Sequence, residues 1–302
     1  MTDSQSSQLK DQQRTAWLFV APALIGLFIF VGLPFALAAI LSFTNLRIGS
    51  PLPLEFLGFE QYERILKDPA FLRALLNNGI FALVVVPLQT AIALGLALLL
   101  NQPLKGMAIF RTFFFMPVVF PMSLVSVVWI LIYAPNADGM MNSFLEFLTF
   151  GFWETTDFLR DPWFALPSII LLSMWQGVGF QMVIILAGLQ SIPENLYEAA
   201  AIDGSNKFNQ FIHVTLPQLK NTLIFVMLVT SILAFRLFDQ VKIMTQGGPN
   251  EATTTVMYEA VKAAFEQQKM AKGAAMTVVF FLVVLAITII QRLVVKQERA
   301  ID

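Results

Sequence analysis

Six long apolar runs dominate the pattern of hydrophobic and polar positions along the chain. Each run is about as long as the roughly 20 residues that a helix needs to cross the hydrocarbon core of a bilayer. The first is longer than the apolar region of a secretory signal peptide, so we expect a retained membrane anchor. The pattern predicts an all-α, polytopic membrane protein with six transmembrane helices. The predicted membrane spans are Ala16–Phe43, Leu76–Leu100, Phe110–Ala134, Trp163–Leu189, Leu223–Met244 and Ala274–Val295.

These runs also predict how the chain is organised. Residues 1–15 are polar and rich in Ser and Gln, and we expect them to be a flexible N-terminal segment. Residues 16–75 would hold the first membrane helix and an outer loop, and residues 76–295 a core of five membrane helices. That core includes a patterned polar loop at residues 190–220. Residues 296–302 would be a short C-terminal tail.

Composition strengthens the membrane assignment. Hydrophobic residues make up 57% of the chain and charged residues only 13%, against about 45–50% and about 25% in soluble domains. The mean hydropathy is +0.71. These values exclude a soluble enzyme, a disordered chain and a coiled coil. The net charge of −1 gives no basic surface for nucleic acid.

Charge gives a weak indication of orientation. Six spans place both termini on one side of the membrane. With the termini inside, the inner segments carry nine of the 19 Lys and Arg residues and the outer segments eight. Because positive residues accumulate on the cytoplasmic side, this small excess favours cytoplasmic termini.

Catalytic and metal-binding motifs are absent from the sequence. The chain has no cysteine and one histidine, His213, which we interpret as a surface or interface residue. No GxxxxGK[ST], HExxH or GxSxG motif occurs. We therefore expect no catalytic residue, no metal site and no cofactor bound by this chain.

The loop at residues 190–220 is too polar to cross a membrane. Ser191 and Glu194 have the spacing of a capping box, and Gly204 follows an alanine-rich helical stretch as a stop signal. Ser205 is a candidate cap for a second short helix that ends before Pro217. The pattern predicts a helix, a glycine turn and a helix on one membrane face. Two interpretations stay open: a hairpin resting on the bilayer, or a docking site for a basic partner protein.

Residue order in this loop resembles a known motif. Glu198-Ala199-Ala200, then Asp203-Gly204-Ser205 and Leu216-Pro217, is similar to the EAA loop of ATP-binding-cassette importer permeases. The preceding Leu189-Gln-Ser-Ile-Pro193 resembles the carbohydrate branch, and Thr245-Gln-Gly-Gly-Pro249 resembles an outer loop of MalF-like and UgpA-like members. The resemblance extends over nearly the whole chain. Asn221 departs from it, since many relatives have proline there.

The resemblance implies a mechanism and a set of partners. The EAA loop would be a coupling helix that contacts a cytoplasmic ATPase dimer, which binds ATP and Mg. A related second permease would complete a heterodimer, and an extracytoplasmic solute-binding protein would deliver the substrate. The protein would lie in the bacterial inner membrane with both termini in the cytoplasm. The implied ATPase-coupling residues are Glu198, Ala199, Ala200, Asp203, Gly204 and Pro217.

Polar and aromatic residues inside two spans are candidates for a substrate path, because such groups are costly within a membrane. Aromatic rings can stack on the C–H faces of a sugar while amides bond its hydroxyls. The alternative is ordinary helix packing, with Arg236 and Asp239 paired on one helix face. The candidate path residues are Trp175, Gln176, Phe180, Gln181, Phe235, Arg236, Phe238, Asp239 and Gln240.

These features together predict the permease subunit of an ATP-driven importer for a sugar or oligosaccharide. A glycerol phosphoester or another polyol is the alternative substrate, and Arg236 would then serve as the cationic group. The more distant alternative is a secondary carrier that does not use ATP.

Overall fold

The computed structural model describes the backbone of residues 3–294 and the side chains of residues 13–293. The predicted tail at residues 296–302 lies outside the described part. Throughout residues 3–294 the regular structure is helical, and the single β-bridge pairs Thr44 with Phe56. The chain divides into two compact units, one of residues 1–66 and 260–279, the other of residues 67–259 and 280–302.

The helices confirm the predicted all-α membrane fold. Five are long and apolar enough to cross a bilayer, and a bent pair makes a sixth span if its two halves are counted together. The halves meet at 99°. The five long segments are Gln13–Leu41, Pro69–Leu100, Ala165–Gln190, Lys207–Phe235 and Met270–Leu293, and the pair is Met107–Val119 with Met122–Ile132.

The predicted third span is therefore broken rather than continuous. Phe120 takes an extended conformation with ψ 138°, and Pro121 follows it. Proline has no N–H for the helical ladder and disfavours the helical conformation in the residue before it. The apolar run at residues 110–134 continues through this point, so hydropathy alone does not reveal the bend.

The larger unit holds most of the helices. Their bounds are α4 (Pro69–Leu100), α5 (Met107–Phe115), η2 (Met116–Val119), α6 (Met122–Ile132), α7 (Met140–Leu148), α8 (Ala165–Gln190), α9 (Glu194–Ile202), α10 (Lys207–Gln210), η3 (Phe211–Thr215), α11 (Leu216–Phe235) and η4 (Val241–Thr245). Two helices are divided between the units. The larger unit includes α12 (Val256–Val261) up to Glu259 and α13 (Met270–Val294) from Phe280 onward.

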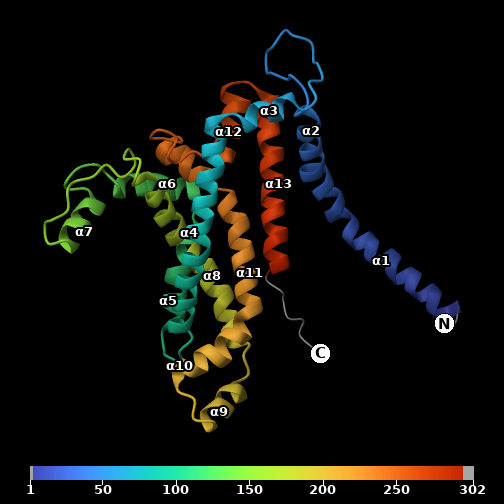
Figure 1. Ribbon diagram of the computed structural model, residues 1–302. Coiled ribbons are helices and arrows are strands. Elements are labelled where there is room, and N and C mark those ends of the chain that lie inside the picture. Colours follow the sequence, from blue (N-terminus) through green and yellow to red (C-terminus); the bar gives the residue numbers. More distant parts are fainter. Residues whose placement is uncertain (1–2, 295–302) are drawn as a thin grey trace. The chain divides into compact units, whose positions relative to one another are not determined.

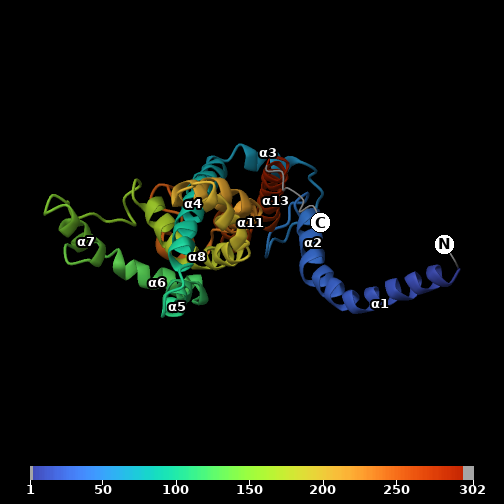
Figure 2. The ribbon, with the colours of Figure 1, turned by 90° about the horizontal axis from the view of Figure 1, so that it is seen from below.

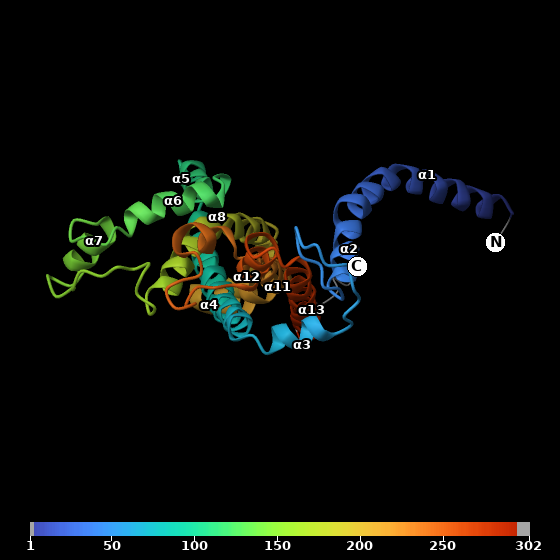
Figure 3. The ribbon, with the colours of Figure 1, turned by 90° about the horizontal axis from the view of Figure 1, so that it is seen from above.

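Helices α4, α8 and α11 pack side by side and form the core of this unit (Figures 1 and 2). Their shared interior is apolar, with Ala93, Met182, Ile185 and Leu219 fully buried. Helices α6 and α7 extend away from this core, as Figure 3 shows. Helices α9 and α10 lie at the other end of the core (Figure 1).

Two glycines of α8 allow its neighbours to approach closely. A Cβ at Gly179 would lie 2.1 Å from the carbonyl oxygen of Phe114 in α5. A Cβ at Gly188 would lie 2.8 Å from Thr222 Oγ1 in α11. Membrane helices pack through such small residues because apolar side chains gain nothing by leaving lipid for protein.

The fifth span differs from its predicted bounds. Helical structure begins at Lys207, runs through α10 and η3 into α11, and stops at Phe235. The prediction of Leu223–Met244 was wrong at both ends. A non-helical break at residues 236–238 precedes a further helical stretch that includes η4.

The smaller unit contains α1 (Asp3–Leu27), η1 (Phe28–Gly32), α2 (Leu33–Leu41) and α3 (Glu60–Leu66), with η5 (Lys262–Glu266) and the first part of α13. The apolar window of Gln13–Leu41 has no residue buried within the protein. Phe19 and Phe30, for example, are exposed. Such a surface requires lipid or another apolar partner, which agrees with a membrane anchor.

Candidate functional site

A cavity of about 340 Å³ opens within the larger unit. Its walls come from α4, the bend between η2 and α6, α8, the end of α11 and the break that follows α11. Gln176 in the wall lies eleven residues after the start of α8, which places it about 16 Å along a helix that is about 39 Å long. The cavity therefore lies near the middle of a membrane-spanning helix.

Polar side chains from different helices bond one another in the cavity wall. Gln240 Nε2 donates to Ser173 Oγ at 3.2 Å, and Gln181 Nε2 donates to Thr230 Oγ1. Gln181 Oε1 is buried and receives no hydrogen bond from the described residues. Buried polar atoms without a partner are costly. The cavity wall thus contains amides and hydroxyls, whereas a helix bundle packed only by apolar side chains would contain neither.

Six of the nine predicted path residues line this cavity. They are Gln176, Phe180, Gln181, Arg236, Asp239 and Gln240. The other three are not part of the lining. Trp175 packs against Trp129, with ring centroids 5.6 Å apart, and Phe235 is buried against Phe280. Phe238 lies in the break after α11.

Three polar residues that line the cavity were not predicted from the sequence: Gln89, Ser173 and Thr230. Gln89 lies in the middle of α4, where Gly177 of α8 makes room for it. A Cβ at Gly177 would lie 2.5 Å from Gln89 Nε2. The available signal was a glutamine in the middle of a mostly apolar run, since polar side chains within a membrane span pack against other helices rather than lipid.

The predicted pairing of Arg236 with Asp239 on one helix face is wrong. Helix α11 ends at Phe235, and Arg236 is its C-cap residue with φ −84° and ψ 15°. The three-residue spacing therefore does not give helical geometry, and the described residues contain no ion pair between these two. Both side chains are exposed and line the cavity. One cation and one anion consequently face the same space.

The loop after α8 forms the predicted helix–turn–helix. Helix α9 spans Glu194–Ile202, and Gly204 follows with a φ of +80°, a conformation that favours glycine. Ser205 N donates to Ala200 O at 2.9 Å and Gly204 N to Ala201 O at 3.0 Å, which closes the helix end. Helix α10 then leads through η3 to Pro217 in the first turn of α11.

The capping residues differ from those predicted. Pro193, not Ser191, is the N-cap of α9, and Ser191 Oγ donates to Gly188 O instead. Asn206, not Ser205, caps α10, and its side chain accepts a hydrogen bond from Asn209 N at 2.8 Å. The cap of α9 lies later than predicted because helix α8 continues to Gln190. The cap of α10 lies later because the glycine turn extends through Ser205.

Side chains within the loop hold its two helices together. Tyr197 OH and Thr215 Oγ1 lie 3.0 Å apart, and Gln210 Nε2 donates to Tyr197 O at 3.4 Å. His213 is exposed, and its Nδ1 lies 3.0 Å from Asn209 O.

The outward surface of the loop combines acidic and apolar groups. Glu198, Ala199 and Asp203 are exposed, while Ala200 is half-buried. Ile202 is 86% exposed and Phe208 is 68% exposed. Exposed large apolar side chains beside carboxylates form a surface suited to contact with another protein.

A polar loop at the other end of the unit follows the Gly247-Gly248-Pro249 motif. Asn77 Nδ2 of α4 donates to the carbonyl oxygens of Glu251 and Thr254, each at 2.9 Å. Asn78 Oδ1 accepts from Val256 N at 2.9 Å. These bonds fix the loop to the start of α4, a pairing that the motif itself did not indicate.

Comparisons with known proteins agree with this architecture. A lactose transport system permease protein of Rhizobium radiobacter is 32% identical to the chain, covering 99% of each. A sulfoquinovosyl glycerol transport system permease protein of Agrobacterium fabrum is 33% identical, covering 94% of this chain and 91% of the relative. A crystal structure of a bacterial alginate transporter, in complex with an alginate pentasaccharide-bound periplasmic protein, contains a chain of the same fold. The TM-score is 0.82 at 19% identity, covering 95% of this chain and 98% of that one.

A family profile described as the inner membrane component of binding-protein-dependent transport systems matches residues 69–300. That range contains the cavity, the α9–α10 loop and the loop after α11. The sequence match, the membrane helices and the shared fold lead to one conclusion: the chain belongs to the family of binding-protein-dependent transport system inner membrane components.

Proposed function

We propose that the chain is the permease subunit of an ATP-driven importer, and that it carries a neutral sugar or oligosaccharide through the cavity between α4, α8 and α11. The observation that carries this proposal is the lining of that cavity. Gln89, Gln176, Gln181 and Gln240 supply amides, Ser173 and Thr230 supply hydroxyls, and Phe180 supplies an aromatic ring. These groups match the hydroxyls and C–H faces of a sugar.

The charge of the lining supports a neutral substrate. Arg236 is balanced by Asp239 on the same cavity wall, so a phosphate group would meet a carboxylate as well as a guanidinium. The names of the two sequence relatives point to carbohydrate transport as well. A glycerol phosphoester is the weaker alternative. It requires that Arg236→Gln abolish uptake, whereas a neutral sugar predicts that Asp239→Asn and Arg236→Gln have effects of similar size.

The α9–α10 loop is the proposed point of coupling to a separate ATPase dimer, which binds ATP and Mg. Its exposed Glu198, Asp203, Ile202 and Phe208 support docking into a cleft of another protein. Gly204 permits the sharp turn that presents α9. Because α11 follows α10 through η3, a displacement of the loop passes directly to the cavity wall.

The remaining partners follow from this assignment. The loop faces the cytoplasm, so both chain termini are cytoplasmic. An extracytoplasmic solute-binding protein delivers the substrate on the other side. A related second permease covers part of the exposed apolar helix surface, and lipid covers the rest. Membership in a binding-protein-dependent family makes an ATP-independent carrier the least supported alternative.

The test combines co-purification with uptake. The tagged full-length chain is purified from its own host in a mild detergent, and the proteins that accompany it are identified by mass spectrometry. Glu198→Lys reverses one exposed charge on α9. Glu146→Lys makes the same change on α7, at the other end of the unit, and is the matched control.

The proposal predicts that wild type and Glu146→Lys retain a P-loop ATPase and a second permease. Glu198→Lys should lose most of the ATPase while keeping the second permease. Uptake of a panel of radiolabelled sugars should fall in parallel. Retention of the ATPase by Glu198→Lys would contradict the coupling role, and uptake of no sugar by the wild type would contradict the substrate class.

A further inference from the structure

A second cavity, of about 170 Å³, lies wholly within the smaller unit and plays no part in the proposed transport path. Four basic side chains and two amides line it, and its lining contains no acidic residue. The charged and amide residues of the lining are Arg47, Arg64, Lys269, Lys272, Asn45 and Gln61.

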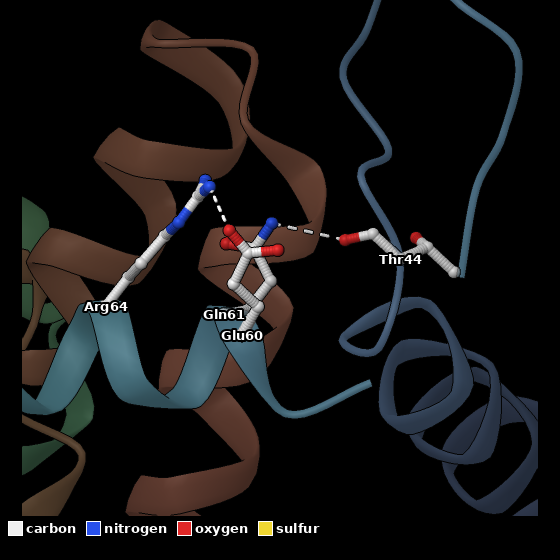
Figure 4. Close-up of polar contacts among 4 residues, drawn as sticks. All are labelled: Thr44, Glu60, Gln61 and Arg64. Carbon is white, nitrogen blue, oxygen red and sulfur yellow. Dashed lines mark hydrogen bonds and ion pairs between the residues drawn. The ribbon is translucent and has the colours of Figure 1, made fainter. Parts of the chain in front are cut away.

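Hydrogen bonds between backbone groups and from one buried side chain hold the three segments of this cavity in place. Ile48 N donates to Gln268 O at 2.9 Å, and Ala271 N donates to Leu46 O at 3.1 Å. Gln61, buried on α3, donates from Nε2 to Thr44 O at 3.2 Å (Figure 4). The basic residues are therefore carried on a fixed framework, so fewer backbone degrees of freedom remain to be ordered on binding.

The charges around the cavity leave it cationic. Arg64 Nη2 pairs with Glu60 on α3, as Figure 4 shows. Glu55, Glu63 and Glu266 are the other acids on the segments that form the cavity, and none of them is part of its lining. Arg47 and Lys269 form no ion pair among the described residues.

The position of the cavity in the chain places it at the membrane boundary. Asn45 and Arg47 follow the end of the Gln13–Leu41 span by a few residues, and Lys269 immediately precedes the Met270–Leu293 span. Both apolar helices end at this level, so the cavity lies where hydrocarbon gives way to lipid headgroups.

Aromatic residues beside the cavity support this depth. Phe43, Phe56, Phe59 and Tyr62 form a cluster with ring centroids 5.2 to 6.2 Å apart. Phe56 is 77% exposed and Phe59 is 70% exposed. Tyrosine is enriched at membrane–water interfaces, and the exposed phenylalanine rings beside Tyr62 offer an apolar surface to lipid.

We propose that this cavity binds the phosphate group of an anionic phospholipid such as phosphatidylglycerol. A phosphodiester offers two oxygens that share one negative charge and accept hydrogen bonds from Arg47 and Lys269. The exposed aromatic cluster lies against the glycerol and the first methylenes of the acyl chains. A soluble anion would use the basic groups but not the aromatic cluster. Lipid binding itself does not depend on the proposed function. The leaflet that supplies the lipid rests on the orientation given there, which makes it the outer leaflet.

Native mass spectrometry of the full-length chain tests this inference independently of transport. The chain is incubated with equal amounts of phosphatidylglycerol and phosphatidylethanolamine that have the same acyl chains, and the retained lipid is measured. Arg47→Gln/Lys269→Gln removes two charges from the cavity. Lys67→Gln/Arg73→Gln removes two basic charges of the larger unit, outside the cavity lining, and is the matched control. Arg47→Lys/Lys269→Arg keeps the charge and tests whether the site still folds.

Basic residues near a membrane surface each strengthen binding of anionic lipid about fivefold. We expect the double glutamine variant to lose roughly tenfold or more of its phosphatidylglycerol retention, while the control and the charge-conserving variant keep the wild-type preference. An excess of inorganic phosphate or of the soluble headgroup should not displace the lipid.

Three results would overturn the inference. Unchanged phosphatidylglycerol retention in Arg47→Gln/Lys269→Gln would remove the cavity as the site. Displacement by inorganic phosphate would make it a soluble-anion site. Unchanged lipid retention together with lost capture of the cognate solute-binding protein would make it a protein-docking surface instead.

Discussion

The cavity and the α9–α10 loop belong to the same unit but are built in opposite ways. Residues that line the cavity come from several segments between Phe81 and Gln240, and its bonds join residues 49 and 67 positions apart. The loop is one continuous stretch, and its bonds join residues at most 18 apart. A local sequence motif therefore defines the loop, whereas only helix packing defines the cavity.

Their surroundings differ as well. Polar groups in the cavity wall form hydrogen bonds with one another because the neighbouring helices provide few other polar partners. Side chains on the outer face of the loop are exposed, and nothing lies within 4 Å of the Cβ position of Gly204. Substitutions near the cavity should consequently alter folding or transport strongly, and substitutions on the loop should act mainly through a partner.

The largest effect is expected where α8 meets α5. Gly179→Ala would place a Cβ 2.1 Å from the Phe114 carbonyl oxygen, a backbone atom that cannot move without shifting the helix. Overpacking of this kind costs about 1–3 kcal/mol, and we expect the upper end or more. Thermal unfolding of the detergent-solubilised chain measures it. Gly95→Ala in α4, with open space at its Cβ, is the matched control and should not be destabilised, because alanine favours a helix over glycine; equal losses in both would refute close packing as the cause.

An intermediate effect is expected in the cavity wall. Gln181→Leu removes an amide that lines the cavity and bonds Thr230. Loss of a hydrogen bond to a substrate hydroxyl, about 1.4 kcal/mol, corresponds to roughly a tenfold rise in the apparent substrate constant for uptake. Uptake in whole cells at varied substrate concentration measures this change.

Gln291→Leu provides the control for that variant. Gln291 of α13 also bonds an α11 hydroxyl, that of Ser231, at 3.0 Å, and its Oε1 is likewise buried without a partner. It is not part of the cavity lining. Both variants should lose a similar, small amount of stability, about 0.6 kcal/mol. Equal loss of uptake in the two would mean that Gln181 serves packing only.

The smallest effect is expected at the loop turn. Gly204→Ala keeps the space open but places an alanine at a φ of +80°, which costs about 1–2 kcal/mol locally. We expect ATP-dependent uptake to fall a few-fold with the fold intact, because the turn is populated less often. Gly204→Asn should retain more uptake, since asparagine tolerates this conformation. If asparagine were worse than alanine, backbone strain would not be the cause.

The membrane helices were predictable because each depends on a long, largely apolar run. The breaks were not. Phe120 and Pro121 interrupt a largely apolar stretch, and α11 stops at Phe235 whereas the predicted span continued to Met244. Cap positions were also missed, by two residues at Ser191 and by one at Ser205, because they depend on where α8 and the glycine turn end. A hydropathy profile identifies the segments that favour the membrane interior. It does not identify the positions at which the backbone hydrogen bonds of a helix are interrupted.

The sequence by itself determined the membrane class, the number of apolar runs and the helix–turn–helix at Gly204, because hydrophobic burial and backbone conformation at that turn are local properties. Only the tertiary structure decided which polar residues share a space. Gln181 and Gln240 line the cavity with Gln89, whereas Trp175 and Phe235 face other helices. The rotation of each helix about its axis is set by its contacts with its neighbours. The basic cavity beside α3 arose in the same way, from loops that backbone hydrogen bonds join across more than 200 residues of sequence.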